Sequence, residues 1–308
     1  MTKVLVSTSS FATFDSSPIK KMEAKGLQVV LNPYKRTLTV AESIELLQGV
    51  SGLIAGTEKL NKEVLESAKE LKVISRCGTG MESVDLNTAK TLGIRVVNTP
   101  EAPIQAVAEL TLGLILALLR HIPLSDRGMR AGIWKKNMGT LLQEKTIGIV
   151  GLGRIGKRVC LLLYPFNVTI VAYDVIPDHT FASSSGIRMV DLEELLRVSD
   201  IVSVHVSSTE CIIGVNELKK MKKSGVLVNI SRGSVVDEDA LIDALRKGEI
   251  TGAALDVFAE EPYSGPLTEL DNVVLTPHTG SYAKESRIEM ETQAVDNLLN
   301  AFKESLLL

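Results

Sequence analysis

The chain has 308 residues, 45% of them hydrophobic and 23% charged, which is the composition of a globular protein long enough for two compact domains. Its net charge of −3 gives no electrostatic reason to expect nucleic acid or an anionic membrane as a partner. The three cysteines lack C-x-x-C spacing, which argues against a disulfide framework or a zinc site. We therefore expect a cytoplasmic protein with no metal.

Short apolar strands alternate with amphipathic helical stretches over the first hundred residues. This alternation predicts a parallel sheet, because parallel strands need crossover connections and helices supply them. We expect strands at residues 4–7, 29–31, 53–55, 73–75 and 96–98, and helices that include 39–47 and 61–69. Asn98-Thr99-Pro100 then interrupts the pattern and marks a crossing into a second domain.

A long apolar helix is expected at residues 104–120, with too few polar residues for one solvated face. We expect it to be covered on more than one side, with a second subunit as one candidate. Its apolar run, residues 110–119, is too short to span a bilayer. No signal peptide is expected at the N-terminus.

A glycine-rich turn is the most informative motif. A buried strand ends in Gly151-Leu152-Gly153-Arg154-Ile155-Gly156, which opens a helix. Gly151 permits the tight turn, Gly153 lets a pyrophosphate approach, and Gly156 lets helix and strand pack closely. Asp174 follows the next strand, 168–173, where a carboxylate binds a ribose and repels a 2′-phosphate. The motif predicts NAD rather than NADP, and the alternative is a purely structural turn.

Four further strands complete a second parallel sheet, and a last helix, expected at 281–302, returns to the first domain. The strands are expected at residues 201–206, 226–230, 253–257 and 273–275, with a helix at 237–247. The pattern predicts an α/β protein of two Rossmann-like, doubly wound parallel-sheet domains with the active site in the cleft between them. The expected domains are residues 1–98 plus 283–308, which are flavodoxin-like, and residues 99–282.

Three charged side chains follow strands of the second sheet. Arg232, Glu261 and His278 lie just past strand ends, and the carboxyl edge of such a sheet is where ligands bind. Together they suit the interconversion of a 2-hydroxy acid and a 2-keto acid. A histidine moves the hydroxyl proton, a carboxylate orients its ring, and an arginine binds a carboxylate or polarises a carbonyl.

Each of these residues also has a structural interpretation. His278 can be a strand-end histidine bonded to backbone, Arg232 can cap a strand or pair with Asp237, and Glu261 can be a surface loop residue. The catalytic interpretation is favoured because all three follow the cofactor motif on one sheet.

These motifs resemble the D-isomer-specific 2-hydroxyacid dehydrogenases, most closely their phosphoglycerate dehydrogenase members. The resemblance covers nearly the whole chain and includes residues 75–80, 98–100, 107–110, 148–156, 229–233, 256–262 and 276–278. It implies that Arg232 binds substrate, that Glu261 is the partner of the histidine, and that His278 is the proton donor. Formate dehydrogenases carry glutamine at the position of Glu261, so formate is not expected as the substrate.

The resemblance also implies binding residues. Backbone N–H groups around Gly78, Thr79 and Gly80 would hold the substrate carboxylate, as glycine-rich nests bind anions. The first domain would then bind substrate, the second would bind NAD, and residues 104–140 would form the arm of a homodimer. The implied cofactor-binding residues are Gly151, Gly153, Arg154, Ile155, Gly156, Asp174, Val206, Ile230, Ser231, Asp256, His278 and Gly280.

The substrate is less constrained than the reaction. Lys135 and Lys136 follow Trp134 and resemble the phosphoglycerate enzymes, so they are candidate phosphate ligands, with a solvated basic loop as the alternative. We expect oxidation of 3-phosphoglycerate to 3-phosphohydroxypyruvate, within serine biosynthesis. Hydroxypyruvate and glyoxylate are alternative substrates, and a non-catalytic NAD-sensing protein is the rival from another class. Since the sequence stops at Leu308, no serine feedback through a C-terminal domain is expected.

Two departures from the family pattern lie close to the expected site. Residues 205–210 lack the usual Pro-Leu-Thr-Pro run, and Thr279 replaces an aliphatic residue after the histidine. The first change is expected to alter NAD affinity or the nicotinamide-side pocket, and the second to alter the wall beside the histidine. Cys77 adjoins the carboxylate nest, but without a base at catalytic spacing it is expected to pack rather than react.

Overall fold

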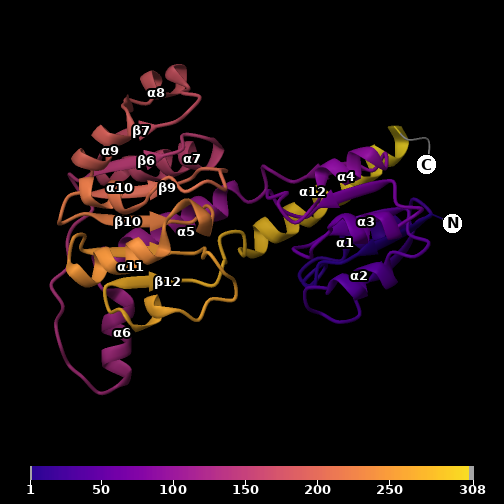
Figure 1. Cartoon of the computed structure of the whole chain (residues 1–308), viewed down its shortest axis with the longest axis horizontal. Coiled ribbons are helices and arrows are strands. Elements are labelled where there is room, and N and C mark those ends of the chain that lie inside the picture. Colours follow the sequence, from indigo (N-terminus) through magenta and orange to yellow (C-terminus); the bar gives the residue numbers. More distant parts are fainter. Residues whose placement is uncertain (1, 305–308) are drawn as a thin grey trace. The chain divides into compact units, whose positions relative to one another are not determined.

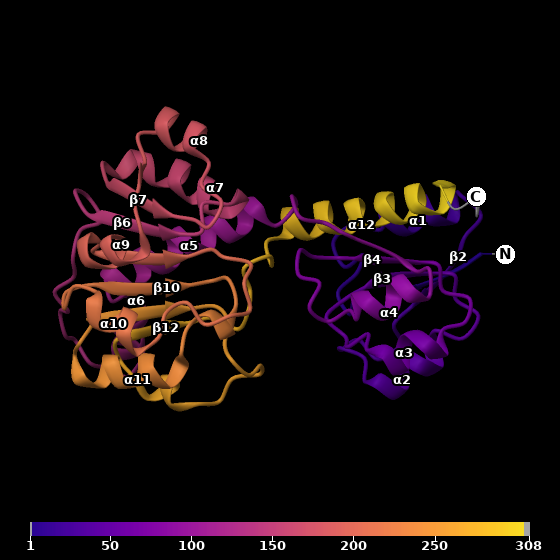
Figure 2. The same cartoon turned by 45° about the horizontal axis from the view of Figure 1, so that its top comes forward.

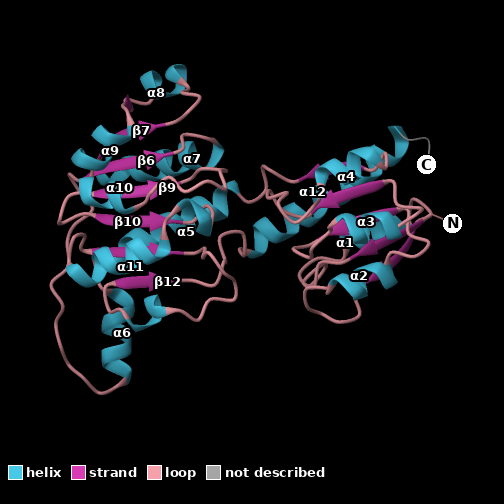
Figure 3. Cartoon of the chain, viewed as in Figure 1, coloured by secondary structure: helices cyan, strands magenta, loops and turns pink. Residues whose placement is uncertain are grey.

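A computed structural model describes residues 2–304, which divide into two compact α/β units. Unit 1 comprises Met1–Pro103 and Ser281–Leu308, and unit 2 comprises Ile104–Gly280. The N-terminal residue and residues 305–308 of the expected first domain lie outside the described residues. All strand pairs in both units are parallel, so the expected doubly wound α/β fold class is confirmed (Figure 3).

Unit 1 is a five-stranded sheet in the order β2-β1-β3-β4-β5, with helices on both faces (Figure 1). Alternate residues of β1 point to opposite faces, because Val4 and Val6 belong to one buried core and Leu5 to the other. Helices α1 and α12 cover the first core, and Figure 2 shows them side by side. Helices α2, α3 and α4 cover the second. The elements are β1 (Lys3–Val6), α1 (Ser17–Glu23), β2 (Gln28–Leu31), α2 (Val40–Leu46), β3 (Gly52–Ala55), α3 (Lys62–Ser67), β4 (Val73–Arg76), α4 (Leu86–Thr91), β5 (Arg95–Asn98) and α12 (Lys284–Glu304).

Unit 2 is a seven-stranded sheet in the order β12-β11-β10-β9-β6-β7-β8. Helices α5 and α7 pack on one face, and α9, α10 and α11 pack on the other. The strand order reverses direction between β6 and β9, and doubly wound sheets bind ligands at such a point. The elements are α5 (Ile104–Leu119), α6 (Ile122–Arg130), β6 (Thr146–Val150), α7 (Arg154–Leu163), β7 (Thr169–Tyr173), α8 (His179–Ser184), β8 (Arg188–Met189), α9 (Leu192–Val198), β9 (Ile201–Val204), α10 (Val215–Lys220), β10 (Val226–Asn229), α11 (Glu238–Lys247), β11 (Gly252–Leu255) and β12 (Val273–Leu275).

Several strands end earlier than their apolar runs suggest. The strand expected at 201–206 ends at Val204, that at 226–230 ends at Asn229, and that at 253–257 ends at Leu255. The apolar residues beyond these ends are partly or fully buried in loops, so hydrophobicity alone extended the predicted strands too far. The last helix begins at Lys284 rather than at residue 281.

The division between the units also differs from the expected boundaries at 98 and 283. Thr99 is buried in unit 1, where its hydroxyl accepts a hydrogen bond from the Gly78 amide at 2.9 Å. The carbonyl of Ala102 accepts a hydrogen bond from the Ser286 hydroxyl at 3.0 Å. These contacts keep residues 99–103 with unit 1, which ends at Pro103.

The apolar helix α5 is covered within its own chain. It packs against α7 and against β10, β11 and β12, and its residues Ala108, Thr111 and Ile115 are fully buried. No single helix among the described residues is long and apolar enough to cross a membrane. Only α5 and α6 taken together have the necessary length and composition, and the two helices are bent by 63° relative to each other.

Candidate active site

The glycine turn after β6 has the geometry that dinucleotide binding requires. Gly151 has a φ of +97°, and a Cβ there would lie 2.9 Å from the His205 carbonyl. At Gly153 a Cβ would meet nothing within 4 Å, so this side of the turn is open. No side chain caps α7, and the positive amino end of a helix attracts a phosphate.

Gly156 fixes how closely α7 approaches the turn. A Cβ at this position would lie 2.1 Å from the Gly151 carbonyl oxygen, a distance that real Cβ atoms do not show. Only glycine lets the helix start against the strand here. The three glycines therefore fit a bound dinucleotide, with one turning the chain, one leaving space and one permitting close packing. Arg154 and Ile155 begin α7 beside them.

Gly156→Ala is expected to destabilise unit 2 by about 1–3 kcal/mol, because the added methyl must displace backbone. It is also expected to weaken NADH binding at least about tenfold, since α7 can no longer present its first turn. Thermal unfolding and NADH fluorescence titration measure the two effects. Gly113→Ala is the matched control, because a Cβ there meets nothing and alanine favours a helix. Wild-type NADH affinity in Gly156→Ala would contradict this account of the turn.

Asp174 lies directly after β7 and contacts the glycine turn. Its Oδ2 accepts a hydrogen bond from the Leu152 amide at 2.7 Å, and its Oδ1 accepts one from the Ile176 amide at 2.9 Å. Each carboxylate oxygen retains a lone pair that can accept a ribose hydroxyl. Asp174, the residue expected to bind the ribose, is therefore held beside the expected pyrophosphate site by hydrogen bonds from backbone amides.

Arg232 leaves the end of β10 in a turn stabilised by Asn229. The Asn229 amide nitrogen donates to the Arg232 carbonyl at 2.8 Å, and its oxygen accepts from the Ser231 hydroxyl at 2.9 Å. The Arg232 guanidinium donates to the Ser231 carbonyl at 2.8 Å. Gly233 lies against the next loop, because a Cβ there would lie 1.9 Å from the Phe258 carbonyl oxygen. Asn229 and Gly233 therefore support the position of Arg232, a role that the sequence analysis did not give them. The Asn-x-x-Arg-Gly spacing is the sequence signal that could have indicated this role.

His278 and Glu261 are joined directly. The His278 Nδ1 lies 2.8 Å from the Glu261 Oε2, and the Glu261 Oε1 accepts from the Phe258 amide at 3.2 Å. With Nδ1 bonded to a carboxylate, the ring presents Nε2 as the nitrogen that can exchange a proton with a ligand. Both side chains are partly exposed, His278 at 54% and Glu261 at 38%.

Asp256 anchors the turn that carries His278. It is 1% exposed, and its Oδ1 accepts from the Thr276 hydroxyl at 2.6 Å and from the Thr279 amide at 2.8 Å. The Thr279 hydroxyl also lies 3.2 Å from Oδ1, and the Gly280 amide donates to Oδ2 at 2.8 Å. The departure at Thr279 therefore adds a hydrogen bond to this anchor. Sequence reasoning gave Asp256 a cofactor role and missed its contacts with the histidine turn.

The altered segment 205–210 begins beside the glycine turn. His205 and Val206 follow β9 and lie against Gly151, because a Cβ there would lie 2.9 Å from the His205 carbonyl and 3.0 Å from the Val206 Cγ1. The His205 Nε2 lies 2.8 Å from the Ser203 hydroxyl, and burial lowers the pKa of His205 to about 3. This histidine is neutral near neutral pH and supports the loop. Ile230 and Ser231, the other expected cofactor neighbours, are buried after β10.

The carboxylate nest expected in unit 1 is only partly available. The Gly78 amide donates to the Thr99 hydroxyl at 2.9 Å and to the Arg76 carbonyl at 3.1 Å, so it is already bonded. The amides of Thr79 and Gly80 remain the candidates. Sequence reasoning also gave no role to Arg76, whose guanidinium lies against Gly78, because a Cβ there would lie 2.9 Å from Nη1.

Lys135 and Lys136 lie in the exposed segment that follows α6, beside Trp134, which is 81% exposed. Nothing in the described residues holds these lysines in place. Among residues 2–304, no group of three or more histidine, cysteine or acidic side chains is arranged to hold a metal ion.

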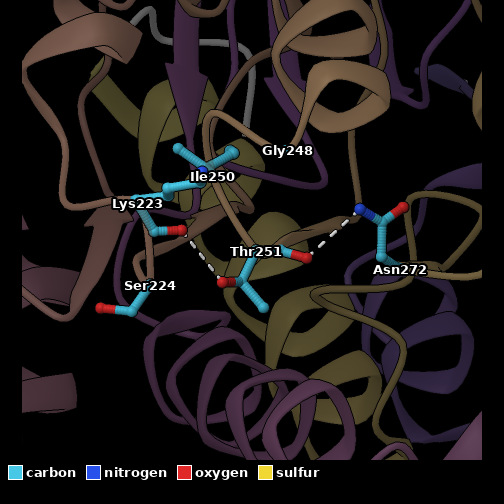
Figure 4. Close-up of a pocket in the computed structure, with 6 residues that line it drawn as sticks. All are labelled: Lys223, Ser224, Gly248, Ile250, Thr251 and Asn272. Atoms are coloured by element: carbon cyan, nitrogen blue, oxygen red, sulfur yellow. Dashed lines mark hydrogen bonds between the residues drawn. The ribbon is translucent and has the colours of Figure 1, made fainter.

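A pocket of about 580 Å³ lies at the amino ends of strands in unit 2, at the edge of the sheet opposite to Arg232, Glu261 and His278. Figure 4 shows Thr251 at its centre, with the hydroxyl donating to the Lys223 carbonyl at 3.1 Å and the carbonyl accepting from the Asn272 amide at 3.2 Å. These residues precede β10, β11 and β12. The catalytic candidates follow the carboxyl ends of the same strands, so this pocket is not their site. Its remaining lining residues are Ser224, Gly248 and Ile250.

Two of the three cysteines are buried. Burial raises the pKa of Cys77 to about 11 and the pKa of Cys160 to about 12, whereas Cys211 is exposed. We therefore expect Ellman's reagent to titrate one thiol per native chain and three after denaturation, because the thiolate is the reactive form. Fast labelling of Cys77 in the native protein would contradict the packing role assigned to it.

The chain is similar to known proteins over most of its length. Residues 112–280 match the family model of the D-isomer specific 2-hydroxyacid dehydrogenase NAD binding domain. The chain is 40% identical over 305 residues to human D-3-phosphoglycerate dehydrogenase, covering 96% of this chain and 56% of the relative. It is 43% identical over 267 residues to glyoxylate reductase from Thermofilum pendens, covering 80% and 76%.

A solved structure shows the same architecture. D-lactate dehydrogenase from Aquifex aeolicus, complexed with NAD and lactic acid, has a TM-score of 0.84 and 26% identity, covering 98% of this chain and 96% of its own. The chain therefore belongs to the D-isomer specific 2-hydroxyacid dehydrogenase family and carries its NAD-binding domain. It spans about half the length of the phosphoglycerate dehydrogenases it matches.

Proposed function

We propose that the protein interconverts a D-2-hydroxy acid and its 2-keto acid with NAD. The observation that carries this proposal is the 2.8 Å contact between His278 Nδ1 and Glu261 Oε2, in the same unit as an open dinucleotide turn. A non-catalytic NAD-sensing protein has no need to keep a proton donor, its carboxylate partner and a supported Arg232 at one sheet edge.

Each residue has a distinct task in this reaction. Bound NADH supplies the hydride that reduces the C2 carbonyl. Arg232 polarises that carbonyl and binds the carboxylate, because a guanidinium offers planar paired donors. His278 gives its Nε2 proton to the forming alkoxide, and Glu261 stabilises the protonated ring before this transfer. In the oxidative direction His278 accepts the hydroxyl proton. The amides of Thr79 and Gly80 hold the substrate carboxylate in unit 1.

For the substrate we propose 3-phosphoglycerate, oxidised to 3-phosphohydroxypyruvate as a step of serine biosynthesis. The 40% identity to phosphoglycerate dehydrogenases supports it, and Lys135 and Lys136 are the phosphate ligands we propose. Glyoxylate or hydroxypyruvate is the second candidate. It is favoured by the 43% identity to a glyoxylate reductase, because this match covers a larger share of the relative than the match to phosphoglycerate dehydrogenase does.

A substrate panel separates these candidates. We expect the purified protein to oxidise NADH with 3-phosphohydroxypyruvate in preference to hydroxypyruvate, glyoxylate or pyruvate, and to prefer NADH to NADPH because Asp174 repels a 2′-phosphate. Replacing both Lys135 and Lys136 by Ala is expected to raise the KM of the phosphorylated acid roughly tenfold, through loss of charged hydrogen bonds. Lys219→Ala, also on the surface of unit 2, is the control. Preference for glyoxylate would replace the phosphoglycerate proposal with the reductase one.

For assembly we propose a homodimer formed through residues 104–140, with no nucleic acid or membrane partner. The support is a group of exposed apolar side chains on and after α6, which water disfavours. They are Ile122, Met129, Ile133, Trp134, Met138 and Leu141, each more than 50% exposed. Sedimentation of the wild type and of Trp134→Ser tests this surface. A cytoplasmic location is proposed with it, on the support of the free cysteines.

A further inference from the structure

A buried ion pair in unit 1 lies apart from the residues assigned above. Arg287 and Glu291 are one turn apart on α12, their side chains are 9% and 3% exposed, and Arg287 Nη2 lies 3.1 Å from Glu291 Oε1. Taking two charges out of water is costly, and a hydrophobic pair would pack as well or better. Stability alone therefore does not explain why this ion pair is buried here.

Both partners also bond to one segment far away in the sequence. Arg287 Nη2 lies 3.0 Å from the Ser10 hydroxyl, and Glu291 Oε2 accepts a hydrogen bond from the Ala12 amide at 2.9 Å. Ala12 has a φ of +59°, which is an unfavourable conformation for an alanine. The two side chains thus hold the loop after β1 (residues 7–16) in a shape that it does not favour by itself.

This loop begins at the point where the unit 1 sheet reverses its strand order. The order β2-β1-β3-β4-β5 places the reversal between β1 and β3, and ligands bind outside the carboxyl ends of strands at such a point. The loop after β3 is hydrogen-bonded to the start of the loop after β1. The Ser7 hydroxyl donates to the Glu58 carboxylate, and the Gly56 amide donates to the same carboxylate at 3.1 Å. Glu58 is 2% exposed.

The loop after β1 also packs beside the carboxylate nest. Phe11 shares a buried cluster with Cys77, the residue before Gly78, and with Met290 of α12. Arg287 and Glu291 are both close enough to Cys77 to act on its thiol electrostatically. Because Phe11 and Cys77 belong to one packed cluster, a shift of this loop would disturb the packing at the start of the nest.

We propose that Arg287 and Glu291 are positioning residues for substrate specificity, which fix the loop after β1 so that Ser9 and Ser10, above the buried Phe11, meet the substituent on C2 of the substrate. The pair acts through the loop and does not touch the reacting atoms. This inference rests on the proposed function, since it assumes a 2-keto acid bound by the carboxyl edge of unit 1.

The test replaces the ion pair by an apolar pair, Arg287→Met with Glu291→Leu. A single substitution would leave a buried unpaired charge and endanger folding, whereas the double change keeps volume and removes both charges. Asp296→Asn is the matched control, because Asp296 lies on the same helix in an exposed ion pair with Lys21. Ser10→Ala removes one bond to the loop without touching the core.

The first measurement is steady-state kinetics with the preferred 2-keto acid. We expect the double variant to raise KM at least about tenfold, because misplacing a binding group by about 1 Å has effects of this size or larger. We expect kcat and the NADH dissociation constant to change less than about threefold, since unit 2 is unaltered. Ser10→Ala is expected to raise KM by a smaller factor, and Asp296→Asn to leave it unchanged.

The second measurement is hydrogen exchange of peptides that cover residues 8–14, which needs no activity. We expect faster exchange there in the double variant and unchanged exchange in β1, because the Ala12 amide loses its acceptor. Wild-type KM and wild-type exchange in a folded double variant would overturn the proposal. A wild-type protein that binds NADH but reduces no 2-keto acid would instead overturn the proposed function, and exchange would still report whether the pair holds the loop.

Discussion

His278→Ala is expected to lower kcat for the preferred 2-keto acid by about 10²–10⁴-fold, because the alkoxide loses its proton donor. The Nδ1 contact with Glu261 leaves Nε2 as the nitrogen that delivers the proton. NADH is expected to bind with a dissociation constant raised by less than about tenfold, because only one expected cofactor contact is lost while the glycine turn and Asp174 remain. Rapid-mixing kinetics and fluorescence titration measure the two quantities.

The control for this variant is His179→Ala, because His179 is exposed at the start of α8. It is expected to retain wild-type kcat and NADH affinity. The assignment of His278 as proton donor fails if His278→Ala keeps more than about a tenth of the wild-type kcat, since a tenfold loss is below what general acid catalysis contributes.

Arg232→Gln is expected to lower kcat/KM by about 10²–10³-fold, the cost of removing one donor to a developing oxyanion. Arg232→Lys keeps the positive charge and loses the planar pair of donors, so it is expected to recover only a small part of the loss. Because Asn229 and Gly233 hold the backbone here, neither change is expected to alter the turn. Initial rates over a range of substrate concentrations give both values.

Arg246→Gln is the matched control, since Arg246 carries the same charge near the end of α11 and lies 3.9 Å from Glu269 in an exposed ion pair. It is expected to leave kcat/KM unchanged. If Arg232→Lys were as active as the wild type, charge alone would suffice, and bidentate binding of the substrate by Arg232 would be wrong.

Local spacing was enough to predict the cofactor motif. Gly151, Gly153 and Gly156 lie within six residues, and each conformation they need follows from the turn between a strand and a helix. The strand–helix alternation likewise predicted two parallel sheets, because a period of two or of 3.6 residues is a local property. Strand ends were less well predicted, because buried loop residues such as Ile230 are as apolar as strand residues.

Contacts between distant segments depended on the fold. The sequence suggested His278 and Glu261 as partners, but their 2.8 Å contact and the anchoring of the histidine turn by Asp256 required the packing of β11 against β12. The bond between Gly78 and Thr99, which removes one amide from the expected nest, joins the ends of β4 and β5.

By itself the sequence determined the fold class, the cofactor turn and the family, because these depend on spacings that a linear chain displays directly. Only the tertiary structure decided which polar groups are already bonded and which are left for a ligand. The Ala12 amide and the Glu291 carboxylate lie 279 residues apart, and no periodicity or motif relates them. Their contact exists because α12 packs on the same face of the sheet as the loop after β1.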